Sequence, residues 1–123
     1  MSELSVVVDD IELSAQWTQS NQDLIAQLTR HLPLSGMAHK WGDELYFTVP
    51  IEASPRETQT IVEPGTIAYW PAGPALCLFW GPTPASTDER PAAASPVAPV
   101  GVLDSIEPLS TITGNAHVTI QQK

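Results

Sequence analysis

The chain has 123 residues, of which 42% are hydrophobic and 15% are charged, a composition that suits one folded domain and not a disordered chain. Its 14 acidic and 5 basic residues give a net charge of −9. That balance argues against nucleic acids and anionic membranes as partners, because both are bound through clustered Lys and Arg side chains.

Twelve prolines and seven glycines interrupt the chain too often for long helices, so many short strands are expected. The first two, residues 4–8 and 11–17, are apolar or alternating segments around Asp9 and Asp10, which predicts a hairpin.

Residues 21–32 predict the one substantial helix. Apolar side chains recur there at helical spacing, and Pro33 follows. Ser20 and Asp23 have the spacing of a capping box, which marks the start of a helix. We expect the apolar stripe of this helix to plug one opening of a barrel or to cover one face of a sheet.

The central part of the chain returns to strand patterns. Residues 37–41 and 45–49 flank a tight turn at Gly42-Asp43-Glu44, and residues 50–60 are polar and form a loop. Three further strands are predicted at 61–62, 66–70 and 75–80, and the last, apolar on both faces, should lie centrally in the sheet.

Residues 82–96 are rich in Ala, Pro, Ser and Thr and show no periodicity, which predicts a long loop that is either a functional lid or a disordered insertion. Residues 97–103 then predict a strand, 105–109 a turn or short helix, and 117–121 a closing strand. The whole chain is therefore expected to form a single mainly-β domain, a sandwich or a barrel.

Two sequence blocks carry a family resemblance: WGDELYFTVP from Trp41 to Pro50, and PGTIAYWPAGPALCLFWGPTP from Pro64 to Pro84. Together with the Pro-Arg-Glu triplet at residues 55–57 and the N-terminal hairpin and helix, they resemble a small family of bacterial and archaeal cyclophilin-like proteins of unknown function. The resemblance covers nearly the whole chain, and residues 1–123 are expected to form a single cyclophilin-like domain. It implies a closed β-barrel of about eight strands with one main helix. Ala98 and Val102 depart from the polar residues that relatives often have near the late glycine, here Gly101.

Aromatic residues mark the candidate site, because seven of the eight lie between residues 41 and 80. Successive residues of a strand point to opposite faces, so Tyr46 and Phe47 must diverge, as must Tyr69 and Trp70, and Phe79 and Trp80. One set should fill the barrel, and the other should form an outer aromatic surface suited to a small molecule or a proline-containing peptide. The expected ligand-binding residues are Glu44, Tyr46, Phe47, Arg56, Tyr69, Trp70, Phe79 and Thr83.

Two functions fit this surface. The first is ligand binding without the standard isomerase site, with Glu44 and Arg56 as polar anchors. The alternative is a peptidyl-prolyl cis-trans isomerase, or another small enzyme, that uses Arg56 as its catalytic residue. Because the sequence motif that surrounds the catalytic arginine of true cyclophilins is absent, binding is preferred. An oligomeric structural subunit is a third possibility, and a monomer and a homodimer both remain open.

Other chemistry has little support in the sequence. Cys77 lies in an apolar strand, where its thiol should stay protonated. His31, His39 and His117 occur singly, so neither a metal site nor a cofactor is predicted. The N-terminus lacks the pattern of a signal peptide, and the longest apolar run, residues 75–80, is far shorter than the roughly 20 residues of a membrane span. A cytoplasmic protein is therefore expected.

Overall fold

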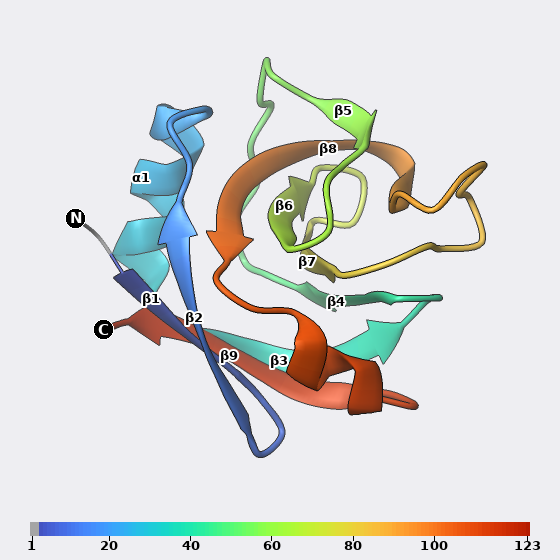
Figure 1. Ribbon diagram of the computed structural model, residues 1–123. Coiled ribbons are helices and arrows are strands. Elements are labelled where there is room, and N and C mark those ends of the chain that lie inside the picture. Colours follow the sequence, from blue (N-terminus) through green and yellow to red (C-terminus); the bar gives the residue numbers. More distant parts are fainter. Residues whose placement is uncertain (1–2) are drawn as a thin grey trace.

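The computed structural model describes residues 3–123, which form nine strands, one α-helix and one short 3-10 helix (Figure 1). In chain order the elements are β1 (Glu3–Val8), β2 (Ile11–Trp17), α1 (Gln22–His31), β3 (Leu34–Lys40), β4 (Glu44–Thr48), β5 (Gln59–Ile61), β6 (Thr66–Trp70), β7 (Ala75–Phe79), β8 (Ala92–Leu103), the 3-10 helix η1 (Glu107–Thr111) and β9 (Ala116–Gln122).

Eight of the strands close into a ring, in the order β2-β1-β9-β3-β4-β7-β6-β8, and β8 pairs back with β2. The long strand β8 makes closure possible, because its second half pairs with both β6 and β2 while its first half pairs with the short ninth strand β5. Figure 1 shows β8 as a strongly curved ribbon that sweeps from β5 to the edge of β2. The predicted closed, mainly-β barrel with one main helix is confirmed.

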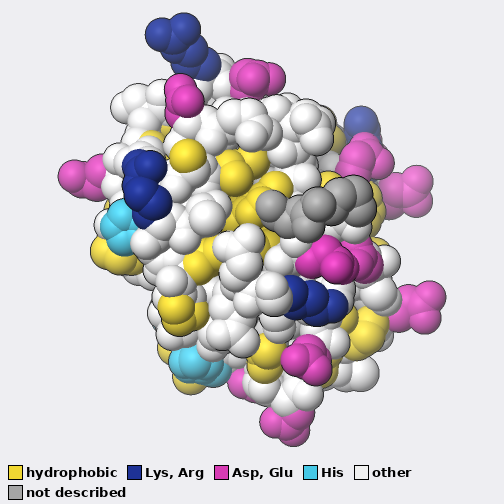
Figure 2. All heavy atoms as spheres, turned by 90° about the vertical axis from the view of Figure 1, so that its left-hand side faces the viewer, with side chains coloured by type: hydrophobic (Ala, Val, Ile, Leu, Met, Phe, Trp, Pro, Cys, Tyr) yellow, Lys and Arg dark blue, Asp and Glu magenta, His cyan; other side chains and the backbone are white. Residues whose placement is uncertain are grey.

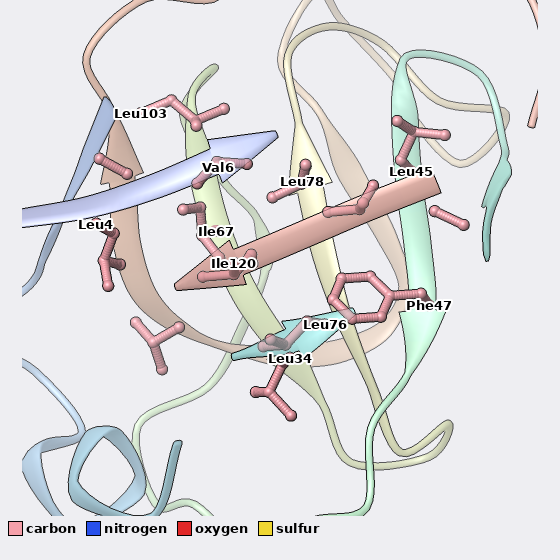
Figure 3. Close-up of a cluster of buried hydrophobic side chains, with 14 of the residues drawn as sticks. Leu4, Val6, Leu34, Leu45, Phe47, Ile67, Leu76, Leu78, Leu103 and Ile120 are labelled. Carbon is pink, nitrogen blue, oxygen red and sulfur yellow. The ribbon is translucent and has the colours of Figure 1, made fainter. Parts of the chain in front are cut away.

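The main core lies inside this ring. Figure 3 shows the side chains of β4, β6 and β7 converging with those of β1, β3, β8 and β9. Ten of these residues are buried to 5% exposure or less: Leu4, Val6, Leu34, Leu45, Phe47, Ile67, Leu76, Leu78, Leu103 and Ile120. The helix α1 adds Leu24, Ile25 and Leu28 to the same cluster, as its predicted apolar stripe required.

A second, smaller cluster lies on the outer face of the β4–β7–β6 part of the sheet. It is formed by Val62, Ala68, Cys77, Phe79, Ala93 and Val97, with Tyr46 and Trp70 packed against it. The predicted division of the aromatics is confirmed, because Phe47, Tyr69 and Trp80 belong to the main core while Tyr46, Trp70 and Phe79 belong to the outer cluster.

The first half of β8 corrects the prediction of a loop over residues 82–96, because Ala92 already begins the strand. Residues 92–96 lack the β-branched residues that usually mark a strand, and Pro96 cannot donate a backbone hydrogen bond. The segment is extended because β5 pairs with it, from Gln59 opposite Val97 to Ile61 opposite Ala92. The outer cluster buries its apolar side chains. The irregular loop is therefore shorter, residues 82–91.

The start of α1 also differs from the prediction. Asn21 occupies the cap position in a left-handed conformation, and no side chain caps the helix, so Ser20 and Asp23 do not form a capping box. The side-chain amide of Asn21 instead donates hydrogen bonds to the backbone oxygens of Glu57 and Pro99, at 3.1 and 3.0 Å. The residue therefore joins the start of the helix to the 50–58 loop and to β8.

The face that carries α1 and the start of β1 is shown in Figure 2. Lys and Arg side chains are scattered over it, with acidic side chains between them and at its margins. No helix within residues 3–123 combines the length and apolar character needed to cross a membrane.

Candidate functional site

A cavity of about 230 Å³ lies between the outer face of the β4–β7–β6 sheet and the first half of β8. Its walls are three aromatic side chains, a carboxylate, a thiol and three small apolar residues of β8. They are Trp41, Glu44, Tyr46, Trp70, Cys77, Ala93, Ala94 and Val97.

The turn between β3 and β4 places two of these residues. Gly42 has φ of +61°, a backbone conformation that residues other than glycine rarely adopt. The backbone amide of Trp41 donates to the Glu44 carbonyl oxygen at 2.9 Å and closes the turn. A Cβ atom at Gly42 would lie only 2.7 Å from the Cα of Thr83. Asp43 makes two backbone hydrogen bonds, each 2.9 Å, to the segment that follows β7. The turn is therefore clamped against that segment, which fixes Trp41 and Glu44 at the cavity.

The Glu44 side chain is the chemical centre of the cavity. It begins β4 opposite Phe79 and is only 5% exposed. Burial raises the pKa of Glu44 from its ordinary 4.5 to about 7, and a hydrogen bond from the Cys77 thiol offsets part of that rise. Burial also raises the pKa of Cys77 well above its usual value, with the Glu44 carboxylate adding to the effect. The thiol therefore stays protonated, as the sequence predicted, and faces a carboxyl group poised to ionise near neutrality.

Aromatic rings form one side of the cavity. The rings of Tyr46 and Trp70 meet edge to face, with 6.0 Å between their centroids and 76° between their planes. The indole N–H of Trp70 donates to the Ser95 hydroxyl at 2.6 Å, which satisfies the polar edge of the ring. The His39 ring lies 5.5 Å from that of Tyr46. Strands β3, β4, β6 and β8 thus hold the two rings between them.

Thr83 anchors the start of the β8 wall. It is 7% exposed, and its hydroxyl donates to the Ala92 carbonyl oxygen at 2.5 Å. Its backbone amide donates to the Ser86 hydroxyl at 2.9 Å. The residue therefore ties the 82–91 loop to the strand that carries Ala93 and Ala94, and does not itself line the cavity.

The structure brings three of the residues predicted from the sequence together, Glu44, Tyr46 and Trp70. Phe47 and Tyr69 point to the other face of the sheet, into the main core. The Tyr69 hydroxyl donates to the carbonyl oxygen of Ile51 at 2.7 Å and accepts from the amide of Ala53 at 3.2 Å.

Phe79 and Arg56 also lie outside the walls of the cavity. Phe79 is fully buried in the outer cluster, in register with Glu44. Arg56 borders a separate polar hollow of about 530 Å³, which it shares with Asn21 and Gln22 near the start of α1. The predicted site residues thus divide into a cavity group, a core group and one residue at a different surface.

Sequence reasoning did not assign Trp41, Cys77 or the β8 residues to the site. Trp41 carried a signal, because it opens the WGDE turn and was counted among the clustered aromatics. Ala93 and Ala94 lie in the 82–96 segment, whose length predicts a lid or an insertion, but nothing in its Ala/Pro-rich sequence, or at Val97, indicates which face of the sheet it covers. Within residues 3–123, no three His, Cys, Asp or Glu side chains gather in a way that could hold a metal ion.

Comparison with known proteins finds similarity over nearly the full length of the chain. A family model described as Cyclophilin-like matches residues 2–121. The solution structure of a hypothetical protein from Archaeoglobus fulgidus is similar, with 31% sequence identity and a TM-score of 0.79 over 99% of this chain and 95% of that one. No curated protein matches the sequence.

Proposed function

The chain belongs to the cyclophilin-like family, and from this premise we propose that it is a binding protein that takes a small organic molecule into the cavity between Trp41, Glu44, Tyr46 and Trp70. A fold alone does not determine activity, so the function must follow from the residues of this cavity.

One observation carries the proposal: a carboxylate that is 5% exposed lines a cavity with aromatic walls. Burying a carboxylate is unfavourable unless it gains a partner. A mostly apolar pocket with a few convergent polar groups and a titratable residue of shifted pKa is typical of a binding site. Glu44 therefore fits a role as the polar anchor of a ligand whose apolar part contacts the rings.

The size of the cavity favours a small molecule over a peptide. At roughly 30 Å³ for each water, 230 Å³ corresponds to about eight water molecules. That space suits a compact ligand, or the end of a larger one, and not several residues of an extended chain. A proline-containing peptide could place one side chain in it.

The same geometry supports binding over isomerisation. Arg56, the arginine that an isomerase would need, lines the hollow beside α1, and no arginine lines the aromatic cavity. An assay on an Ala-Pro peptide tests the alternative, because we expect no turnover above the uncatalysed rate. Turnover that Arg56→Ala abolishes would refute a purely binding role.

Binding is tested by amide and indole NMR shifts during titration with three probes of nearly the same shape: choline, the neutral 3,3-dimethylbutan-1-ol and the anionic 3,3-dimethylbutanoate. We expect at least one probe to shift the signals of Trp41, Tyr46 and Trp70. The variant Ala94→Phe should block these shifts by filling the cavity from an exposed position.

The matched control for that variant is Ala85→Phe, which places the same ring on an exposed residue of the 82–91 loop outside the cavity. It should leave the shifts intact. If none of the three probes perturbs the cavity residues at millimolar concentration, the proposed function is wrong.

A further inference from the structure

Resting on the proposed function, we propose that the ligand is a small organic cation, an alkylammonium group that enters between Trp41, Tyr46 and Trp70 and is neutralised by Glu44. Three features of the cavity select this class: a carboxylate without a cationic partner, walls of aromatic rings, and the absence of basic side chains from its lining.

Among residues 3–123, no basic side chain forms an ion pair with the Glu44 carboxylate. The ion pair between Arg90 and Asp88, at 2.7 Å, is the only one within residues 3–123. Lys40, the basic residue nearest to Glu44 in the sequence, donates its ammonium hydrogen to the carbonyl oxygen of Gly42 at 2.7 Å. A buried charge that lacks a partner is strongly unfavourable, so a ligand that brings a positive charge would gain most from this position.

The titratable groups around Glu44 do not replace that partner. Strand β7 contributes the Cys77 thiol, β4 contributes Tyr46, and the turn contributes Asp43, whose carboxylate lies against Gly81. His39 on β3 packs against Tyr46 and does not line the cavity. Strands β6 and β8 present only uncharged side chains to it. Each neighbour that can ionise at the cavity would carry negative charge, which adds to the preference for a cation.

The aromatic walls give the second attraction. A cation within about 6 Å of a ring centroid is attracted to the negative face of the ring, most strongly for Trp and when the site is shielded from water. The cavity has two Trp rings and one Tyr ring, and Ser95 already accepts the indole hydrogen of Trp70. A carboxylate combined with several aromatic faces suits an alkylammonium group, whose methyl or methylene groups also gain from apolar contact.

An anion is disfavoured by the same residues. Within the described residues 3–123, no Lys, Arg or His lines the cavity, and a chain with a net charge of −9 repels anions at long range. A neutral molecule of the same shape would keep the apolar contacts but lose the pairing with Glu44. The three probes named above therefore separate the classes, because choline and 3,3-dimethylbutan-1-ol differ only by nitrogen in place of carbon.

The experiment measures the dissociation constant of each probe at pH 8 by NMR titration or calorimetry. Choline should bind at least about tenfold more tightly than 3,3-dimethylbutan-1-ol, a ratio that corresponds to about 1.4 kcal/mol, and the anion should bind most weakly. Glu44→Gln should reduce the choline preference to less than about threefold. Glu12→Gln removes one negative charge from an exposed residue of β2 and should leave the preference unchanged.

The pH profile gives a second readout, because choline keeps its charge at every pH. If Glu44 must be ionised, choline affinity should fall about tenfold from pH 8 to pH 6, and the neutral probe should show no such fall. Equal binding of choline and the neutral alcohol, or a preference that Glu44→Gln leaves intact, would overturn the cation proposal and leave a binding cavity. Absence of binding by all three probes would overturn both proposals.

Discussion

The two faces of one part of the sheet, β4–β7–β6, differ in what they do. The inner face carries Leu45, Phe47 and Leu78 into the barrel, where each is at most 1% exposed. The outer face carries Glu44 and Tyr46, and there the covering strand β8 leaves a cavity. Both faces are formed by the same fifteen residues of backbone, five from each strand.

A closed barrel can therefore carry a binding site on its outer face while its interior stays undisturbed. The interior is occupied by buried side chains such as Phe47 and Leu78, and because protein cores are close-packed it offers no room for a ligand. The first half of β8, paired with β5, lies over the outer face, and its small residues Ala93 and Ala94 leave a cavity beside Cys77. The buried carboxyl group of Glu44 is tolerated there because it faces the cavity.

The largest effect is expected from a pair of neighbouring substitutions on β4. Phe47→Ala removes a ring that is 1% exposed in the core and should lower the free energy of unfolding by about 3–5 kcal/mol. Tyr46→Ala removes a partly exposed ring from the outer face and should cost about 1 kcal/mol while abolishing choline binding. Urea unfolding and choline titration measure the two quantities. If Tyr46→Ala proved as destabilising as Phe47→Ala, the outer face would be structural core.

Glu44→Gln should stabilise the free protein. Because burial raises the folded-state pKa of Glu44 from 4.5 to about 7, the folded state holds a proton that the unfolded state has lost between those pH values. The free energy of unfolding therefore falls as pH rises through this window. At about 1.4 kcal/mol per pH unit, Glu44→Gln should gain about 3 kcal/mol over the natural protein at pH 8 and almost nothing near pH 4.

Urea unfolding of both proteins at several pH values checks this difference, and Glu12→Gln serves as the exposed control, with a change within about 0.5 kcal/mol at every pH. If the difference in free energy of unfolding does not grow between pH 4 and pH 8, burial does not disfavour the ionised form of Glu44. A residue that lowers stability in its ionised form is expected where the charge serves binding.

More of the barrel than of the cavity could be predicted from the sequence. Alternation places Tyr46 and Phe47 on opposite faces, and likewise Tyr69 and Trp70, and this depends only on strand geometry. Which face becomes the barrel interior depends on the curvature and closure of the whole sheet. For that reason the predicted ligand site combined residues from both faces.

The rest of the site depends on contacts between segments far apart in the chain. Ala93 and Val97 reach the cavity because β5 pairs with β8 and because Thr83 ties the preceding loop to Ala92. None of these contacts has a local pattern in an Ala/Pro-rich segment. The place of Arg56 beside α1 likewise follows from the path of the 50–58 loop, which Asn21 fixes through the carbonyl oxygen of Glu57.

Tyr69→Phe tests the inner face through a polar contact. The Tyr69 hydroxyl is hydrogen-bonded to the carbonyl oxygen of Ile51 and to the backbone amide of Ala53. Its removal leaves each of these two groups with one hydrogen-bond partner fewer. The free energy of unfolding should fall by about 2 kcal/mol. Choline affinity should not change, because the hydroxyl anchors the 50–58 loop and not the cavity wall. A loss of affinity without a loss of stability would instead assign Tyr69 to the ligand site.

The smallest effect is expected at Ser95, which touches the site only through Trp70. Ser95→Ala removes the acceptor of the indole hydrogen bond and should cost about 1 kcal/mol or less, since both groups are partly exposed. The Trp70 indole proton should move in the NMR spectrum, and choline affinity should fall about threefold because the ring is less firmly held. Ser105→Ala, at an exposed position outside the cavity, should change neither. If Ser95→Ala moves the indole signal and leaves choline affinity intact, the Trp70 ring does not need this hydrogen bond in order to bind ligand.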